Sequence, residues 1–372
     1  MRSYISTFFA RNFVLLCLFL VGILCTVCCS EIDRDANRNT REINIPDAPF
    51  DKLSDYGFFI GEQLAALKPA ARLLPYELNS ALFSDYTSKL RFVWMPQGSA
   101  AKWTDEEVFD FPEGAVLIKN FFYKSELTRN IIETRLLIKR ENKWESLPYI
   151  WNETQTEAYL KLAGGKAKID LAKYVGNPHS TKASFEFDYI VPNKNQCKGC
   201  HSVSGDLKPI GPKARNLNKL INYGFGDESQ LDKWINMGYL SEAPESDYRP
   251  SIEDYNNENA LLHDRALAYL EINCGHCHRS EGPASTSGLH LITSEKELSK
   301  LGFCKTPVAA GKGSGGLSYD IHPGKPDSSI LLYRMKIQDP GIRMPEVGRQ
   351  VLHQEGVDLI SEWISALEYP CN

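Results

Sequence analysis

Two copies of the pattern Cys-x-x-Cys-His limit what this chain can fold into more than any other feature. They lie at Cys197-Lys198-Gly199-Cys200-His201 and at Cys274-Gly275-His276-Cys277-His278. The two thiols of such a pattern can form thioethers with haem vinyl groups, and the adjacent histidine can bind the iron from one side. The sequence therefore predicts two covalently bound haem c groups. The predicted attachment residues are Cys197, Cys200, Cys274 and Cys277, and the predicted iron ligands are His201 and His278.

Two other chemistries use closely spaced cysteines. A zinc site built from two Cys-x-x-Cys pairs has about 15–20 residues between the pairs, whereas Cys200 and Cys274 are much farther apart. A dithiol redox pair does not need a histidine directly after its second cysteine. Haem attachment therefore explains the two patterns best.

Residues 1–29 have the layout of a signal peptide. They contain Arg2 and Arg11, no acidic residue, and an apolar run over 13–27. The run is shorter than the roughly 18 residues that a membrane-spanning helix needs, so we expect cleavage and export to the periplasm. Covalent haem attachment in bacteria takes place outside the cytoplasm, which agrees with export. Retention of the segment would instead leave the protein at the membrane.

Two cysteines at the end of the signal segment leave a second kind of anchor open. Cys28 or Cys29 could become a lipid-bearing N-terminus, as in a lipoprotein, although the residues before them do not form the usual Leu-small-small lead. The alternative is that both thiols are simply apolar residues of the segment. The predicted location is therefore the periplasm or the membrane surface.

Length and composition exclude several classes of protein. The 372 residues are 42% apolar and 24% charged, as in ordinary globular proteins. Because a single domain usually takes about 100–200 residues, we expect more than one. The net charge is −5 and no basic stripe is interleaved with aromatic residues, so a nucleic-acid partner is not expected.

The pattern of apolar residues changes near residue 190. Before it, short aromatic and β-branched runs separated by turn residues predict an antiparallel β domain; the clearest runs are 89–95, 115–122, 131–139 and 184–191. After it, apolar spacing predicts helices over 230–239, 261–273 and 355–367. The predicted fold class is α+β and multidomain, with an N-terminal antiparallel β domain followed by two small all-α cytochrome c-like haem modules. The predicted divisions are a signal peptide at 1–29, a linker at 30–47, the β-rich domain at 48–190, and haem modules at 191–256 and 257–372.

A second axial ligand decides whether a haem iron is closed or has an open position. Met344, in a loop after the second motif and before the last predicted helix, is the expected sixth ligand of the second haem. Met335 lies in a helical pattern and is expected in the core. For the first haem the nearest methionine is Met237, for which core packing is an equal alternative. His179 and His263 are further candidates, and an open position is also compatible with the sequence.

Two cysteines lie outside both motifs and the signal segment. Cys304 and Cys371 could form a disulfide between a loop and the C-terminus, because an exported protein can oxidise free thiols. The same residues could also remain unpaired thiols.

Several stretches outside the motifs resemble a family of exported dihaem c-type cytochromes. This family was first catalogued as conserved hypothetical proteins and is often encoded beside a parallel β-helix protein. The C-terminal part is also similar to class I cytochrome c, and Gly211-Pro212 resembles the Gly-Pro whose proline carbonyl accepts a hydrogen bond from the proximal imidazole. The stretches that carry the family resemblance are Phe111-Pro112-Glu113-Gly114, Ile210-Gly211-Pro212-Lys213-Ala214-Arg215-Asn216-Leu217-Asn218, Pro283-Ala284-Ser285-Thr286-Ser287-Gly288-Leu289-His290-Leu291, Lys305-Thr306-Pro307-Val308-Ala309-Ala310-Gly311 and Met344-Pro345-Glu346-Val347-Gly348-Arg349.

The resemblance implies haem binding and one-electron transfer between partners in the cell envelope, such as an exported dehydrogenase or the β-helix protein. The main alternative is an enzyme, a peroxidase-like dihaem oxidoreductase with an open site at the first haem. Peroxidases of that kind usually place their two motifs much farther apart than Cys197 and Cys274. An electron-transfer protein without catalytic residues is therefore the preferred prediction.

Overall fold

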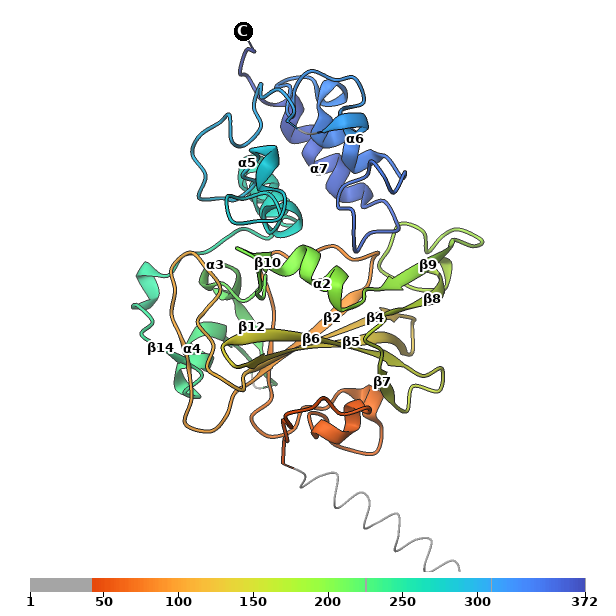
Figure 1. Cartoon of the computed structure of the whole chain (residues 1–372), viewed down its shortest axis with the longest axis vertical. Helices are drawn as coiled ribbons and strands as arrows, with labels where there is room; N and C mark the ends of the chain where they lie inside the picture. The colour runs from red at the N-terminus through yellow and green to blue at the C-terminus, as the bar shows by residue number, and fades with distance from the viewer. Residues whose placement is uncertain (1–41, 225, 309, 372) are drawn as a thin grey trace, which may run out of the picture.

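The described part of the chain combines one antiparallel sheet with a later region of short helices. It was obtained as a computed structural model and comprises residues 42–224, 226–308 and 310–371 (Figure 1). This arrangement confirms the α+β class and the N-terminal position of the β structure. The predicted signal peptide at 1–29 lies outside the described residues. Among the residues that are described, no helix is long and apolar enough to cross a membrane.

The sheet has six strands in the order β1-β2-β4-β5-β6-β7, and every neighbouring pair is antiparallel. Three of the four predicted runs form β2, β4 and β5 of this sheet, because aromatic and β-branched residues suit a pleated and buried surface. The fourth run, 184–191, forms a strand of a separate hairpin, and β1, β6 and β7 were not among the predicted runs. The strands are β1 (Leu74–Tyr76), β2 (Ser88–Trp94), β4 (Val116–Lys124), β5 (Arg129–Arg140), β6 (Lys143–Trp151) and β7 (Ala158–Leu160).

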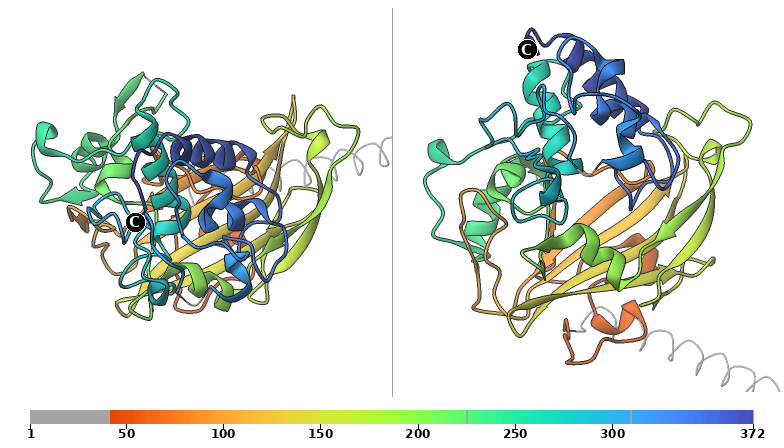
Figure 2. Two further views of the ribbon diagram at one scale, coloured as in Figure 1. Left: turned by 90° about the horizontal axis from the view of Figure 1, so that it is seen from above. Right: turned by 45° about the horizontal axis from the view of Figure 1, so that its top comes forward.

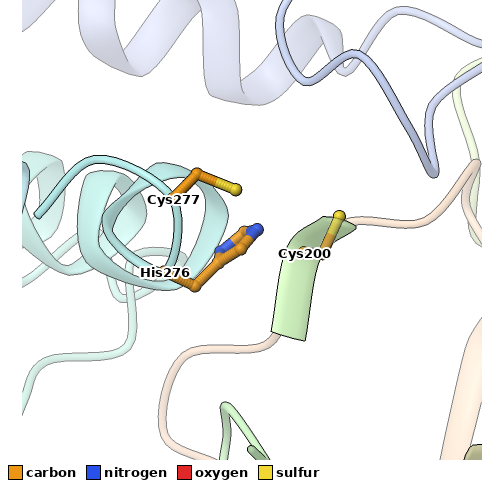
Figure 3. Close-up of side chains that lie close together, drawn as sticks. All are labelled: Cys200, His276 and Cys277. Carbon is orange, nitrogen blue, oxygen red and sulfur yellow. The ribbon is translucent and has the colours of Figure 1, made fainter. Parts of the chain in front are cut away.

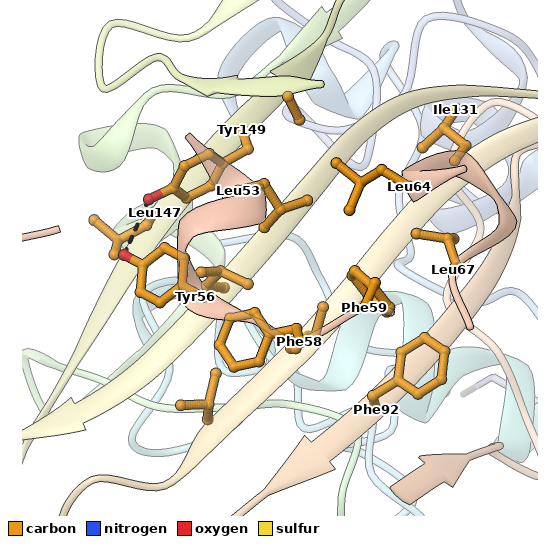
Figure 4. Packing of buried hydrophobic residues seen from close by; sticks show 14 of the residues in the cluster. Leu53, Tyr56, Phe58, Phe59, Leu64, Leu67, Phe92, Ile131, Leu147 and Tyr149 are labelled. Atoms are coloured by element: carbon orange, nitrogen blue, oxygen red, sulfur yellow. Dashed lines mark hydrogen bonds between the residues drawn. The ribbon is translucent and has the colours of Figure 1, made fainter. Parts of the chain in front are cut away.

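One face of this sheet packs against the N-terminal segment. Residues of β2, β4, β5, β6 and β7 point to this face, and the 3₁₀ turns Leu53–Tyr56 and Leu64–Ala66 pack against them. Figure 4 shows the resulting apolar layer, in which the hydroxyl of Tyr149 donates to that of Tyr56 at 3.0 Å. The segment just after the predicted linker is therefore part of the β domain's core.

The opposite face of the sheet is covered by the rest of the chain. The hairpin of β8 (Gly165–Asp170) and β9 (Glu186–Val191) leads into α2 (Lys194–His201), which lies over the sheet. Helices α5 (Leu262–Leu270), α6 (Ile330–Lys336) and α7 (Gln354–Ser365) lie beyond α2 on the same side (Figures 1 and 2). The sheet thus separates the N-terminal segment from both cysteine motifs.

The segment at 191–256 differs from the all-α module that the sequence predicts. It contains short strands as well as short helices, and it packs on the sheet. Leu240 of one of these strands pairs with Ala101, and Trp234 is fully buried against the aromatic rings of Phe109 and Phe111. Its elements are β10 (Ser202–Val203), β11 (Asp206–Leu207), α3 (Ala214–Leu217), β12 (Leu220–Asn222), β13 (Asp227–Ser229), α4 (Gln230–Asn236) and β14 (Leu240–Ser241), with β3 (Ala101–Lys102) as the partner of β14.

Helix α4 starts at the predicted residue but ends three residues earlier than predicted. The Ser229 side chain accepts a hydrogen bond from Asp232 N, which satisfies a free amide at the helix start. The helix ends at Asn236, because Gly238 follows Met237 with a φ of 70°, a conformation that glycine adopts readily.

The C-terminal region forms a second core around the predicted helices. Helix α5 falls within its predicted range, and α7 begins one residue before its predicted start. Ile360, Trp363 and Ile364 of α7 are buried in this core. A disulfide joins Cys304 to Cys371 and ties the chain end to the loop after the second motif. The structure therefore realises the paired alternative for these two cysteines.

The loop between β1 and β2 holds the three parts of the molecule together. Asn79 Nδ2 donates to the carbonyl of Arg215 at 3.0 Å, and Phe83 N donates to Asn273 Oδ1 at 2.9 Å. The carboxylate of Asp85 accepts from the amides of Gln350 and Val351. These contacts reach the first motif's segment, the second motif's helix and the chain before α7.

The apolar face of the sheet should dominate the stability of the β domain. Leu147 in β6 is fully buried, whereas Leu127 in the β4–β5 turn is 95% exposed. We expect Leu147→Ala to lower the free energy of unfolding by about 2–5 kcal/mol and Leu127→Ala to change it by less than about 0.5 kcal/mol. Denaturant unfolding followed by circular dichroism measures both, and equal shifts would contradict this packing.

Candidate functional site

Both cysteine motifs open onto the same internal cavity. The cavity has a volume of about 560 Å³ and lies between the charged face of the sheet, α2, and helices α5 and α6. All four motif cysteines and both adjacent histidines line it: Cys197, Cys200, His201, Cys274, Cys277 and His278. The four cysteines are free thiols. Two motifs that are far apart in sequence thus form one site.

The first motif owes its geometry to a capped helix. Asn193 and Gln196 exchange side-chain and backbone hydrogen bonds of 2.9 and 3.0 Å at the start of α2, so the helix begins directly after β9. Cys197 and Cys200 are three residues apart and therefore share one helix face. Cys197 is buried and Cys200 is half-buried at the cavity.

The second motif lies where α5 continues into a single π-helical turn, Glu271–Gly275. Gly275 has no room for a side chain, because a Cβ there would lie 2.5 Å from the carbonyl oxygen of Leu291. The amide of Leu291 in turn donates to the carbonyl of His278 at 2.8 Å. The glycine of this motif is thus required by close backbone packing.

The hydrogen bonds of the two motif histidines select one tautomer. His201 Nδ1 lies 2.8 Å from the carbonyl oxygen of Lys208, which can only accept. His278 Nδ1 lies 3.1 Å from Ser287 Oγ, whose own proton is donated to the carbonyl of Ala284. In both rings Nδ1 therefore carries the proton, and Nε2 keeps a free lone pair.

Burial keeps both imidazoles neutral. It lowers the pKa of His201 to about 4 and that of His278 to about 4. A neutral imidazole with a free Nε2 is the form that ligates a metal. The proline that the sequence proposed as hydrogen-bond partner has another role, because the Pro212 carbonyl accepts from Phe109 N and the Lys208 carbonyl serves His201.

A third histidine lies between the motifs. The ligand atoms of Cys200, His276 and Cys277 all lie within 4.8 Å of one another, and Figure 3 shows the three side chains converging from two separate helical segments. Hydrogen bonds with Cys277 and His276 hold the pKa of the Cys200 thiol below its usual range. His276 Nδ1 is buried without a hydrogen-bond partner. His276 was not among the predicted ligands, although its position inside the second motif marks it as a candidate.

The methionines separate into two groups. Met344 is half-buried and lines the cavity, and its carbonyl accepts from Arg349 at 2.6 Å. Met335 also touches the cavity but is buried in the C-terminal core, as expected. Met237 is 38% exposed and is not among the residues that line the cavity. Of the two methionines predicted as ligands, only Met344 lines the cavity that both motifs line.

The other two histidine candidates lie outside the cavity lining. His179 stacks on Phe185 with ring centroids 3.8 Å apart. His263 Nδ1 accepts a hydrogen bond from Trp363 Nε1 at 3.1 Å. Both rings therefore have structural partners away from the motifs.

A buried ion pair holds the two motifs against each other. Arg215 of α3 donates to Glu271 Oε1 through Nε at 2.8 Å, and its Nη2 lies 2.7 Å from the same oxygen. Glu271 begins the π-helical turn of the second motif and also accepts from Thr293 N at 2.9 Å. Burial alone would raise the pKa of Glu271, but Lys213 and Arg215 outweigh burial and lower it. The pair therefore remains ionised between the two halves of the site.

The sheet presents positive charge to the cavity. Arg91, Lys119 and Arg135 all line it, and they come from β2, β4 and β5. The only carboxylate paired with one of them among the described residues is Glu133, at 2.5 Å from Arg135. No motif in the sequence singles out these three residues, because they lie in three different strands.

The side chains of the two motifs match the ligands that covalently bound haem requires. Covalent haem needs two thiols for each group and an imidazole with a free Nε2, and both motifs offer these at one cavity. The residues present therefore fit two haems c. Comparison with protein-family models, curated proteins and solved structures found no match to this chain.

Proposed function

We propose that this protein is an exported dihaem c-type cytochrome that transfers single electrons in the periplasm or at the membrane surface. The observation that carries the proposal is the convergence of all six motif residues on one cavity. The signal-peptide layout of residues 1–29 supports export. The sequence resemblance to exported dihaem cytochromes points to the same function and to redox partners in the cell envelope.

The roles of the residues follow from their chemistry. Cys197 and Cys200 would attach one haem, and Cys274 and Cys277 the other. His201 and His278 would each offer Nε2 to an iron, while Lys208 O and Ser287 Oγ fix the rings through Nδ1. Haem iron supplies reversible one-electron redox chemistry when it is bound. The chain contributes attachment, ligand orientation and a largely apolar enclosure.

We propose a modified form of the two predicted haem modules. The segment with α5, α6 and α7 would be a cytochrome c-like module around the second haem, with Met344 as the sixth ligand. The first haem would lie between α2 and the sheet, because its segment packs on the β domain. The two haems would therefore share one cavity, and the sheet would line one side of it.

A second candidate function is supported by the cluster of Cys200, His276 and Cys277. Two thiolates and an imidazole are ligands that zinc prefers, and a site with three protein ligands keeps one position open. This alternative competes with haem attachment, because Cys200 and Cys277 cannot serve as thioethers and as thiolate ligands at once. It makes the protein a metal-binding protein without a cytochrome role.

Removal of either thiol pair should remove one haem. We expect denatured Cys274→Ser/Cys277→Ser protein to retain half of the covalent haem stain of the parent, because the first pair remains intact. Cys197→Ser/Cys200→Ser is the matched variant and should also retain half. Mass spectrometry of both proteins measures the result. Full retention in either variant would refute attachment at that motif.

Replacement of Met344 should change the ligation of one iron. We expect Met344→Ala to abolish the methionine-to-iron charge-transfer band of the oxidised protein, since the thioether is lost. Met237→Ala is the matched control and should keep the band, because Met237 lies outside the cavity lining. An unchanged spectrum in Met344→Ala would show that the sixth ligand lies elsewhere.

Substitution of His276 separates the two candidate functions. If the protein is a cytochrome, His276→Ala should leave the amount of covalent haem unchanged, because this residue attaches nothing. If the cluster holds zinc, the parent should contain zinc and no covalent haem, and His276→Ala should lose most of that zinc. Elemental analysis and haem staining of exported protein decide between them.

A further inference from the structure

Three cations form a straight row across the middle of the sheet. In the ladder of paired strands, Arg91 lies directly opposite Lys119, and Lys119 lies directly opposite Arg135. Residues paired in this way point to the same face of a sheet, and like charges in that position destabilise it. The face in question is the one that lines the cavity. The row therefore needs a compensating charge.

The protein itself supplies only part of that compensation. Glu133 accepts from Arg135 and from the hydroxyl of Tyr189 at 2.6 Å, which leaves its carboxylate committed to that end of the row. Within the described residues, neither Arg91 nor Lys119 forms an ion pair with an acidic side chain. Arg91 is only 7% exposed, and its Nη2 is buried with no hydrogen-bond partner.

Such an arrangement is costly unless an anion meets these cations. A buried charge without a partner is strongly unfavourable, and a guanidinium cannot escape the cost by losing its proton. Lys119 responds instead, because burial together with Arg91 and Lys89 lowers its pKa well below the usual value. Two guanidinium groups and one lysine thus line the cavity, and Glu133 is the one carboxylate that pairs with any of the three among the described residues.

We propose that Arg91, Lys119 and Arg135 form a binding site for carboxylate or oxyanion groups on the sheet wall of the cavity. A planar guanidinium group binds two such oxygens at once, and a bound anion would favour the protonated form of Lys119, which then adds a point charge. Two sources share this chemistry. One is the propionate of a haem held by the motifs, which depends on the proposed function. The other is a free anion that enters the cavity, which does not.

The first arm of the test examines the propionates of the haem-loaded protein. With haem carrying ¹³C-labelled propionate carboxylates, redox-induced infrared difference spectra report how those carboxylates are bonded. We expect Arg91→Met to shift their stretching bands and Arg91→Lys to restore the parent bands in part. Lys143→Met removes an exposed cation from the same sheet and should change nothing. If Arg91→Met does not fold, Lys119→Met tests the same row at a half-buried position.

The second arm examines free anions. Calorimetric titration of the parent with acetate and with inorganic phosphate should show no saturable binding if propionates occupy the row. Saturable binding that is lost in Arg91→Met would instead assign the row to a free anion. Unchanged infrared bands together with no anion binding would overturn the proposal. Haem staining of the parent is measured separately. Absence of haem would refute the cytochrome function, and the anion titration would still test the row of Arg91, Lys119 and Arg135.

Discussion

The ion pair between Arg215 and Glu271 is the contact on which the site depends. It joins α3, which belongs to the segment packed on the sheet, to the turn that carries the second motif. Both side chains are less than a tenth exposed, and loss of one partner from a buried pair typically costs about 3–5 kcal/mol. Lys213 also reaches Glu271, with its Nζ 3.7 Å from Oε1, so two cations of the first motif's segment meet the turn of the second motif.

The sheet is buried on both faces, but by different means. On one face, Leu147, Tyr149 and their neighbours pack under the N-terminal segment, which is ordinary apolar burial. On the other face, polar and charged side chains meet the cavity and the motifs. The β domain is one wall of the site, and the segments that carry the two motifs are the other. This explains why the first motif's segment could not form an independent module.

The sequence could predict the elements that depend on local patterns. Alternation placed the central strands, periodic apolar residues placed α5 and α7, and the motif spacing placed each histidine beside its cysteine pair. It could not predict which carbonyl His201 would use, because Lys208 reaches the ring only through the turn of β10 and β11. It favoured Met344 as a ligand and left Met237 open between ligation and core packing, and the position of the cavity excludes Met237 from its lining.

By itself, the sequence determined the chemistry that the chain can carry: two pairs of thiols, each followed by an imidazole, behind a segment with the layout of an export signal. Only the tertiary structure decided that both pairs share one cavity and that His276 lies between them. It also decided that Arg91, Lys119 and Arg135 face inward. The physical reason is that a period of two shows which residues share a face of a sheet. What covers that face depends on contacts between residues far apart in the chain.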